Sequence, residues 1–221
     1  MAVVLGISPF SAAAQAAYPA RPVRVIVPYS PGGSSDAVAR ILSQKLGEIW
    51  GQQVVVDNRA GAGGMLAHDM LAKSAADGYT LLMGSSGGLV IQPLMPAKLP
   101  YDAMKDFAPV TRLATSAFLM VVNPSVAAKS VKELIALAKA KPGSLNYASA
   151  GQGSSLHLTG EIFKMATGTD LVHVAYKGSA PALTDLIAGQ VQIMFGTMPA
   201  TLPQALPMHR WARAFISCAG R

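Results

Sequence analysis

Four segments rich in glycine and hydroxyl side chains each follow a run of apolar, strand-forming residues. They read PYSPGGSSD at 28–36, GSSGG at 84–88, SAGQGSS at 149–155 and GTMPAT at 196–201, and none contains lysine or arginine. Backbone N–H groups in such turns, or at the start of a following helix, can bind a small anion. Each turn taken alone is also compatible with ordinary serine capping of a helix, at 34–35 and 154–155 for example. Their repetition at several strand ends favours a ligand site.

Several other kinds of ligand site are excluded by the sequence. No Gly-Lys dipeptide occurs, which excludes a Walker A loop, and GAGGML at 61–66 ends in leucine where the dinucleotide fingerprint needs glycine or alanine. The four histidines are scattered and Cys218 is the only cysteine, so the usual zinc spacing is missing. We expect His157, beside the 149–155 segment, to make a local hydrogen bond rather than to act as a ligand or base.

A serine hydrolase is the alternative reading of the same turns. GSSGG at 84–88 matches the G-x-S-x-G pattern with Ser86 at its centre, and Asp170 and His173 follow in the hydrolase order. A nucleophile elbow must run directly into a helix, however, and here Pro93 and Pro96 follow closely. Asp170 and His173 also precede or begin a strand, which is the wrong end for a site at strand carboxyl ends.

Strand and helix patterns alternate along the chain and must position these turns. The predicted helices cover 34–50, 130–140, 154–167 and 180–188, and in the first of them Val38, Ile41, Leu42 and Ile49 share one face. The predicted strands cover 23–28, 53–58, 79–85, 117–123, 145–150, 171–176 and 191–196. This alternation predicts an α/β fold with mainly parallel sheets, in which ligands bind outside the carboxyl ends of the strands.

Composition and charge agree with a folded protein that binds a small anion. Of the 221 residues, 51% are hydrophobic and 13% are charged, and the net charge is +7, with no run of basic residues interleaved with aromatics. This composition does not favour a nucleic-acid partner. Residues 1–16 resemble an export signal, since an apolar run leads to small residues and an A-x-A site at 14–16. We therefore expect an exported protein.

Five separated segments resemble the substrate-binding proteins of tripartite tricarboxylate transporters, also called the Bug family. They are VIVPYSPGGSSDAVAR, VVVDNRAGAGGMLA, ADGYTLLMG, YASAGQGSSLHLTGEIF and VAYKGSAPALTDLIAGQVQIMF, in the family's order between about Pro19 and Gln204. The resemblance implies a type II periplasmic-binding-protein fold with a first lobe at 17–108, a second lobe at 109–204 and a ligand cleft between them. It further implies a periplasmic receptor for a small organic carboxylate, without catalysis or cofactor, that delivers its ligand to membrane subunits of the transporter.

The resemblance also implies which residues would hold the ligand. In the first lobe they are Tyr29, Gly32, Gly33 and Asp36, with Ser85 and Ser86; in the second they are Ser149, Gly151, Ser154 and Ser155, with Gly196 and Thr197 near the cleft. Asp36 is unexpected beside an anion, and its alternative role is to stabilise the first turn of a helix.

The resemblance stops after Gln204. The family continues there with a strand that returns to the first lobe, whereas this sequence reads ALPMHRWARAFISCAGR over 205–221. We expect these residues to be an aberrant tail, from truncation or a frameshift, and the first lobe to be incomplete.

Overall fold

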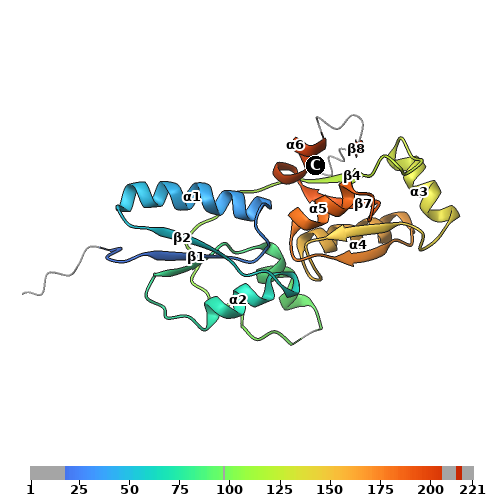
Figure 1. Cartoon of the computed structure of the whole chain (residues 1–221). Helices are drawn as coiled ribbons and strands as arrows, with labels where there is room; N and C mark the ends of the chain where they lie inside the picture. Colours follow the sequence, from blue (N-terminus) through green and yellow to red (C-terminus); the bar gives the residue numbers. More distant parts are fainter. Residues whose placement is uncertain (1–17, 97, 206–212, 216–221) are drawn as a thin grey trace, which may run out of the picture.

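The chain forms two α/β bodies, each built on its own sheet, in the computed structural model shown in Figure 1. The structure describes residues 18–96, 98–205 and 213–215. We call the body built on the first sheet the first lobe and the body built on the second sheet the second lobe. No helix or strand lies in the connecting residues 107–117, which contain the predicted boundary at 108–109. The predicted export signal at 1–16 lies outside the described residues.

The first lobe is a three-stranded parallel sheet in the order β2-β1-β3. Its strands are β1 (Val23–Val27), β2 (Val54–Asn58) and β3 (Thr80–Leu82). Helices α1 (Ser34–Trp50) and α2 (Met65–Ala72) lie on opposite faces of this sheet (Figure 1). Three short helical turns complete the lobe: η1 (Ala62–Gly64), the π-helical η2 (Gly87–Ile91) and η3 (Gln92–Leu94).

The second lobe is a five-stranded mixed sheet in the order β6-β5-β7-β4-β8. Its strands are β4 (Phe118–Val122), β5 (Asn146–Ser149), β6 (Val172–Ala175), β7 (Ile193–Thr197) and β8 (Arg213–Phe215). Its helices are α3 (Val131–Ala140), α4 (Ser155–Thr167), α5 (Ser179–Ile187) and α6 (Met198–Ala205). β5 is parallel to β6 and β7, whereas β4 is antiparallel to β7 and β8. Three residues of the predicted tail therefore pair with the second sheet.

All seven predicted strands and all four predicted helices are present, but one helix face is wrong. Ile41 and Ile49 of α1 are exposed, at 67% and 74%, although the apolar pattern placed them on the buried face. The buried residues of α1 are Asp36, Ala39 and Ser43. Hydrophobic periodicity fails here because the buried side of α1 includes a carboxylate and a hydroxyl.

The two lobes differ in the size of their cores. The first lobe has a buried apolar cluster of only Val25, Val27, Ala39 and Met83. The second lobe has two such clusters, one on each side of its sheet, which include Leu134, Tyr147 and Ile193 in one and Leu119, Leu156 and Met194 in the other. Burial of apolar surface is the main favourable term in folding, so the second lobe has the larger share of it.

Candidate functional site

The turn after β1 is held in place by the carboxylate of Asp36, a residue that is 4% exposed. Gly32 N–H donates to Asp36 Oδ2 at 2.9 Å, and Arg40 Nε donates to the same oxygen at 2.9 Å. Asn58 Nδ2 donates to Asp36 Oδ1 at 2.9 Å and to the Tyr29 carbonyl at 3.0 Å. Asp36 therefore joins the turn, helix α1 and the end of β2.

The electrostatic surroundings keep Asp36 ionised. Burial on its own raises the pKa of Asp36, but hydrogen bonds from Arg40, Gly32 and Asn58 outweigh it and hold the pKa below its usual value. The carboxylate accepts three hydrogen bonds from donors of its own lobe. Asp36 therefore supports the structure of the turn.

The turn after β5 is also supported from within its lobe. Ser154 is 1% exposed, and its hydroxyl caps α4 by accepting from the His157 N–H at 3.2 Å. Ser149 is fully buried, and its hydroxyl accepts from the Gly151 N–H at 3.1 Å. Gly153 N–H donates to His157 Nδ1 at 3.3 Å, so the predicted local hydrogen bond of His157 is confirmed. Ser155 begins α4 and is half-buried.

The 151–154 turn approaches the first lobe closely at two glycines, Gly87 and Gly63. A Cβ added to Gly87 would lie 3.1 Å from Ser154 Cα and 3.3 Å from the Tyr29 hydroxyl. One added to Gly63 would lie 2.0 Å from the carbonyl oxygen of Gln152, which leaves no room for a side chain. The structure thus brings Tyr29 and the 151–154 turn to the same contact between the lobes.

A second line of contacts joins the lobes on the side of β7. Ser34 Oγ lies 2.5 Å from Thr197 Oγ1, and Ser30 N–H donates to the Lys177 carbonyl at 3.0 Å. A Cβ on Gly33 would lie 2.7 Å from Ser179 Oγ. Gly196 is buried beside Thr201, whose methyl group would lie 2.1 Å from an added Cβ. The 28–36 turn therefore faces β7 and the start of α5.

Sequence reasoning did not include Ser30, Gly63, Lys177 and Ser179, which lie at these contacts. Contacts between the lobes are made by Ser30 with Lys177, by Gly63 with Gln152 and by Ser179 with Gly33. The segment YKGSAP at 176–181 carried a usable signal, because it follows a strand and contains Gly-Ser just before a helix.

Ser85 and Ser86 have different surroundings, and neither supports the hydrolase alternative. Ser85 Oγ lies 3.2 Å from the Tyr29 hydroxyl, and burial raises the pKa of that phenol, which keeps it uncharged. Ser86 is exposed at the start of the π-helical turn η2. His173, the proposed base, lies 2.7 Å from Ser149 Oγ through its Nε2 atom and not beside Ser86.

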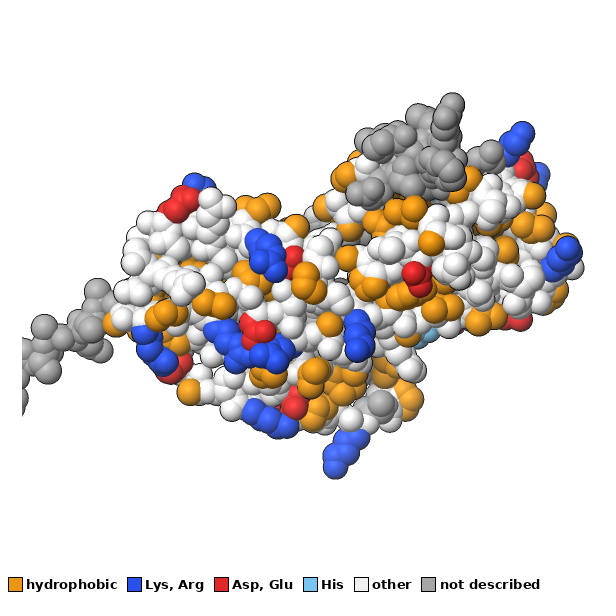
Figure 2. Space-filling model, viewed as in Figure 1, with side chains coloured by type: hydrophobic (Ala, Val, Ile, Leu, Met, Phe, Trp, Pro, Cys, Tyr) orange, Lys and Arg blue, Asp and Glu red, His pale blue; other side chains and the backbone are white. Residues whose placement is uncertain are grey.

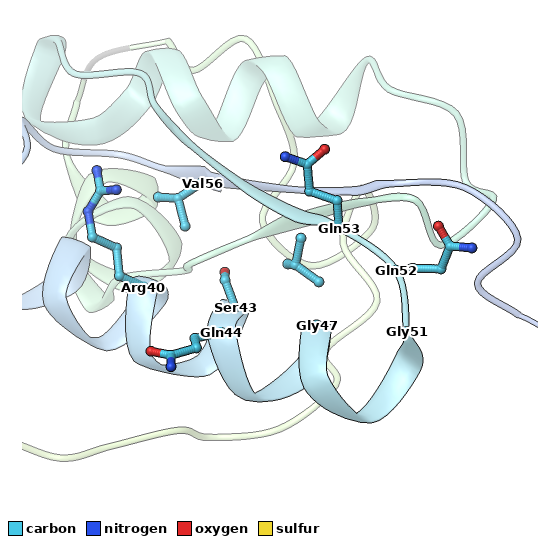
Figure 3. Close-up of a pocket in the computed structure, with 9 residues that line it drawn as sticks. Arg40, Ser43, Gln44, Gly47, Gly51, Gln52, Gln53 and Val56 are labelled. Atoms are coloured by element: carbon cyan, nitrogen blue, oxygen red, sulfur yellow. The ribbon is translucent and has the colours of Figure 1, made fainter.

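The structure contains one cavity beside the 28–36 turn and another along helix α1 of the first lobe. One of about 330 Å³ lies between Gly32, helix α5 and Ala200 of α6, at the β7 side of the lobe contact. The other, of about 450 Å³, lies between α1 and β2 (Figure 3). It runs from Arg40 to Gly51 along α1, away from the helix N-terminus, and contains none of the predicted site residues.

The described part of the chain contains no group of three His, Cys, Asp or Glu that could hold a metal ion. Within the same residues, no helix is long and apolar enough to cross a bilayer. Figure 2 shows basic side chains beside acidic ones on one face of the first lobe. Arg24 and Arg59 both form ion pairs with Asp57. On this face the described basic side chains are thus interrupted by acidic ones.

The family is established by comparison with known sequences. Residues 38–207 match the profile described as "Tripartite tricarboxylate transporter family receptor". The chain belongs to this family. It is 44% identical over 202 residues to Protein BugT of Bordetella pertussis, a match that covers 90% of this chain and 62% of BugT. It is 43% identical to a UPF0065 protein of Pseudomonas sp. strain P51, over 82% of this chain and 54% of that protein.

Solved structures of receptors of this kind share the fold. The chain superposes with a TM-score of 0.85 on R. palustris Rpa4515 with adipate, at 38% identity, covering 90% of this chain and 66% of that one. A TM-score of 0.85 is also found for MatC of Rhodopseudomonas palustris with bound malate, at 32% identity, covering 90% and 67%. The chain also superposes with a TM-score of 0.78 on periplasmic binding protein BugD, at 30% identity, covering 89% and 65%, so the fold is that of a periplasmic binding protein. This chain spans between 54% and 62% of the length of the two sequence relatives above.

Proposed function

We propose that the protein is a periplasmic receptor that holds a small organic carboxylate between its two lobes and delivers it to the membrane subunits of a tripartite transporter. One observation carries this proposal: turns at the carboxyl ends of β1, β5 and β7 meet between the lobes, with N–H groups and hydroxyls as donors. The ligand-bound relatives support the carboxylate, because they were solved with adipate and with malate.

The donors are mostly neutral, and this suits a receptor that must release its ligand. A neutral hydrogen bond contributes about 1 kcal/mol, against about 1.5–3 kcal/mol for one to a charged group. We assign ligand contact to Tyr29, Gly32, Gly33, Ser85, Ser86, Gly151, Ser154, Ser155, Gly196 and Thr197, and a supporting role to Asp36 and Ser149. Ser149 is fully buried, so it acts on the ligand through the turn that it supports.

A thermal-shift titration tests the proposed function. Adipate and malate should each raise the unfolding midpoint of the protein, by an amount that grows with concentration because the ligand binds only the folded state. Gly33→Val should abolish this rise, since a branched side chain would collide with Ser179 Oγ where the lobes meet. Gly51→Ala is the matched control, because no atom lies within 4 Å of that Cβ position. An equal rise in wild type and Gly33→Val would contradict the site, and no rise with any organic acid would contradict the function.

A further inference from the structure

Two histidines lie directly behind the 151–154 turn of the second lobe. The ring centroids of His157 on α4 and His173 on β6 are 4.2 Å apart, and the His173 ring stacks on Tyr147 at 4.9 Å. His173 Nε2 lies 2.7 Å from Ser149 Oγ. We call Ser149, His157 and His173 the histidine cluster.

The histidine cluster fixes the backbone of the turn through two N–H groups. Ser149 Oγ accepts from Gly151 N–H, and His157 Nδ1 accepts from Gly153 N–H, at 3.1 Å and 3.3 Å. His157 can accept at Nδ1 only while that nitrogen carries no proton. The Ser149 hydroxyl in turn has its position set by His173.

The same turn is one of the parts of the second lobe that contact the first. A Cβ added to Gly151 would lie 2.9 Å from Gly63 Cα, and one added to Gly153 would lie 2.7 Å from the Gln92 side chain. There is little space at either contact. A change in the backbone of 151–153 would therefore change how the lobes meet.

We propose that His157 and His173 are positioning residues, which hold the 151–154 turn in its binding geometry while both rings are uncharged and release it when they are protonated. The link to ligand binding rests on the proposed function; the link to the turn does not. No catalytic step is involved, and neither ring is assigned to ligand contact.

The surroundings of the rings disfavour a charge on either one. Burial lowers the pKa of His173, and the neighbouring His157 lowers it further. Together they bring the pKa of His173 to about 4. Burial also lowers the pKa of His157. Two charged groups face the rings, both from α4: Glu161 raises both pKa values and Lys164 lowers them. The Glu161 carboxylate is itself engaged, by the Tyr147 hydroxyl at 2.5 Å and Lys164 Nζ at 3.1 Å.

The direction of the pH effect follows from these shifts. In an opened turn the rings regain an ordinary pKa of about 6.5, so the open form binds more protons than the closed form at lower pH. The closed turn is therefore fully stabilised above about pH 6.5 and becomes less stable as the pH falls from there toward 4, the pKa of His173.

Amide hydrogen exchange of the whole chain, followed by NMR without ligand, tests the positioning role. After correction for intrinsic exchange rates, protection at Gly153 should fall by about tenfold for each pH unit below 6.5, and hence by at least about tenfold between pH 7 and pH 5. His157→Asn keeps an acceptor close to the Nδ1 position but cannot be protonated. Only His173 still titrates in this variant, so its loss of protection over this range should be smaller than that of wild type.

Two further variants separate this role from a general loss of structure. His157→Leu removes the acceptor, so protection at Gly153 should be low at both pH values. Met165→Gln, on the exposed side of the same helix, should behave as wild type. The inference is overturned if wild-type protection at Gly153 is unchanged between pH 7 and pH 5, or if His157→Asn loses as much protection as wild type. If His157→Leu does not fold, the comparison of wild type with His157→Asn still tests the inference.

A thermal-shift measurement with malate and adipate at pH 7 connects the turn to the ligand. His157→Leu should lose most of the ligand-induced rise in the unfolding midpoint, while His157→Asn keeps it. If neither acid stabilises any variant, the proposed function fails for these acids, and the exchange data still decide the role of the histidines. If His157→Leu is stabilised as much as wild type, the turn does not serve binding.

Discussion

The carboxylate of Asp36 receives donors from three different parts of the first lobe. Gly32 lies in the turn, Arg40 on α1 and Asn58 at the end of β2. Local sequence suggested a role at the first turn of the helix, but the bond from Asn58 spans 22 residues and has no local pattern. A residue's chemistry can be read from the sequence, whereas its distant partners depend on how β1 and β2 pair.

Replacing Asp36 by Asn should destabilise the protein by about 1–3 kcal/mol, because an amide N–H₂ would then face one of the buried donors. Chemical denaturation at neutral pH measures this. The folded pKa of Asp36 is lowered, so its stabilising contribution is complete above about pH 4 and is lost as the pH falls below that value. The variant and wild type should therefore converge in acid.

Glu48→Gln on the same helix is the control for that substitution. Its partner Lys45 is exposed, and a surface pair of this kind contributes about 0–1 kcal/mol. If Asp36→Asn is no more destabilising than Glu48→Gln, the carboxylate does not hold the turn.

At the scale of elements, the sequence predicted local structure well and packing poorly. Ser130 caps α3 by accepting from the Glu133 N–H, and Gly168 ends α4 in the left-handed conformation, both as expected from local residue types. Helix α2 was not predicted because it has only 8 residues and follows glycines, and α6 contains Pro203. Local residue patterns could not predict the individual contacts between the lobes, since Ser34 and Thr197 are 163 residues apart. Only the family resemblance implied that a cleft lies between the lobes.

Gly63→Ala tests whether the contact between η1 and the 151–154 turn holds the lobes together. Gly63 has φ +64°, so alanine there costs about 1 kcal/mol in any surroundings, and its Cβ would also collide with the Gln152 carbonyl. Gly51 has φ +62° and open space around it, so Gly51→Ala carries the backbone cost alone.

We expect Gly63→Ala to shift the amide resonances of Gly151 and Gln152 and to lower the unfolding midpoint more than Gly51→Ala does. Equal midpoints, with no change at residues 151 and 152, would show that the lobes do not meet at this place in solution.

For the whole molecule, the difference between the two cores has a measurable consequence. The first-lobe cluster has four buried residues, whereas the second-lobe clusters have eleven and nine. Regions with few buried apolar contacts open more readily. Limited proteolysis of the 221-residue chain should therefore leave a resistant fragment that spans β4 to α6 and cut first within β1 to η3.

Mass spectrometry of the fragments identifies which lobe survives. A resistant fragment from the first lobe, or cleavage of both lobes at the same rate, would show that the small cluster is not the weaker one. The sequence predicted two lobes through its resemblance to the receptor family, but the unequal cores became visible only from the burial of individual side chains.

Close contacts between the lobes are made largely by residues with little or no side chain: Gly63 opposite Gly151, Gly87 opposite Ser154 and Gly33 opposite Ser179. Each buried methylene contributes about 0.8 kcal/mol, so surfaces with so few of them gain little when they come together. In the proposed function the ligand contacts both lobes, so the ligand would supply most of the free energy that favours closure. A preference of only about 1.4 kcal/mol for the closed arrangement shifts the ratio of closed to open molecules tenfold. In the proposed receptor, an interface of glycines would therefore let a small acid decide how often the two lobes are closed.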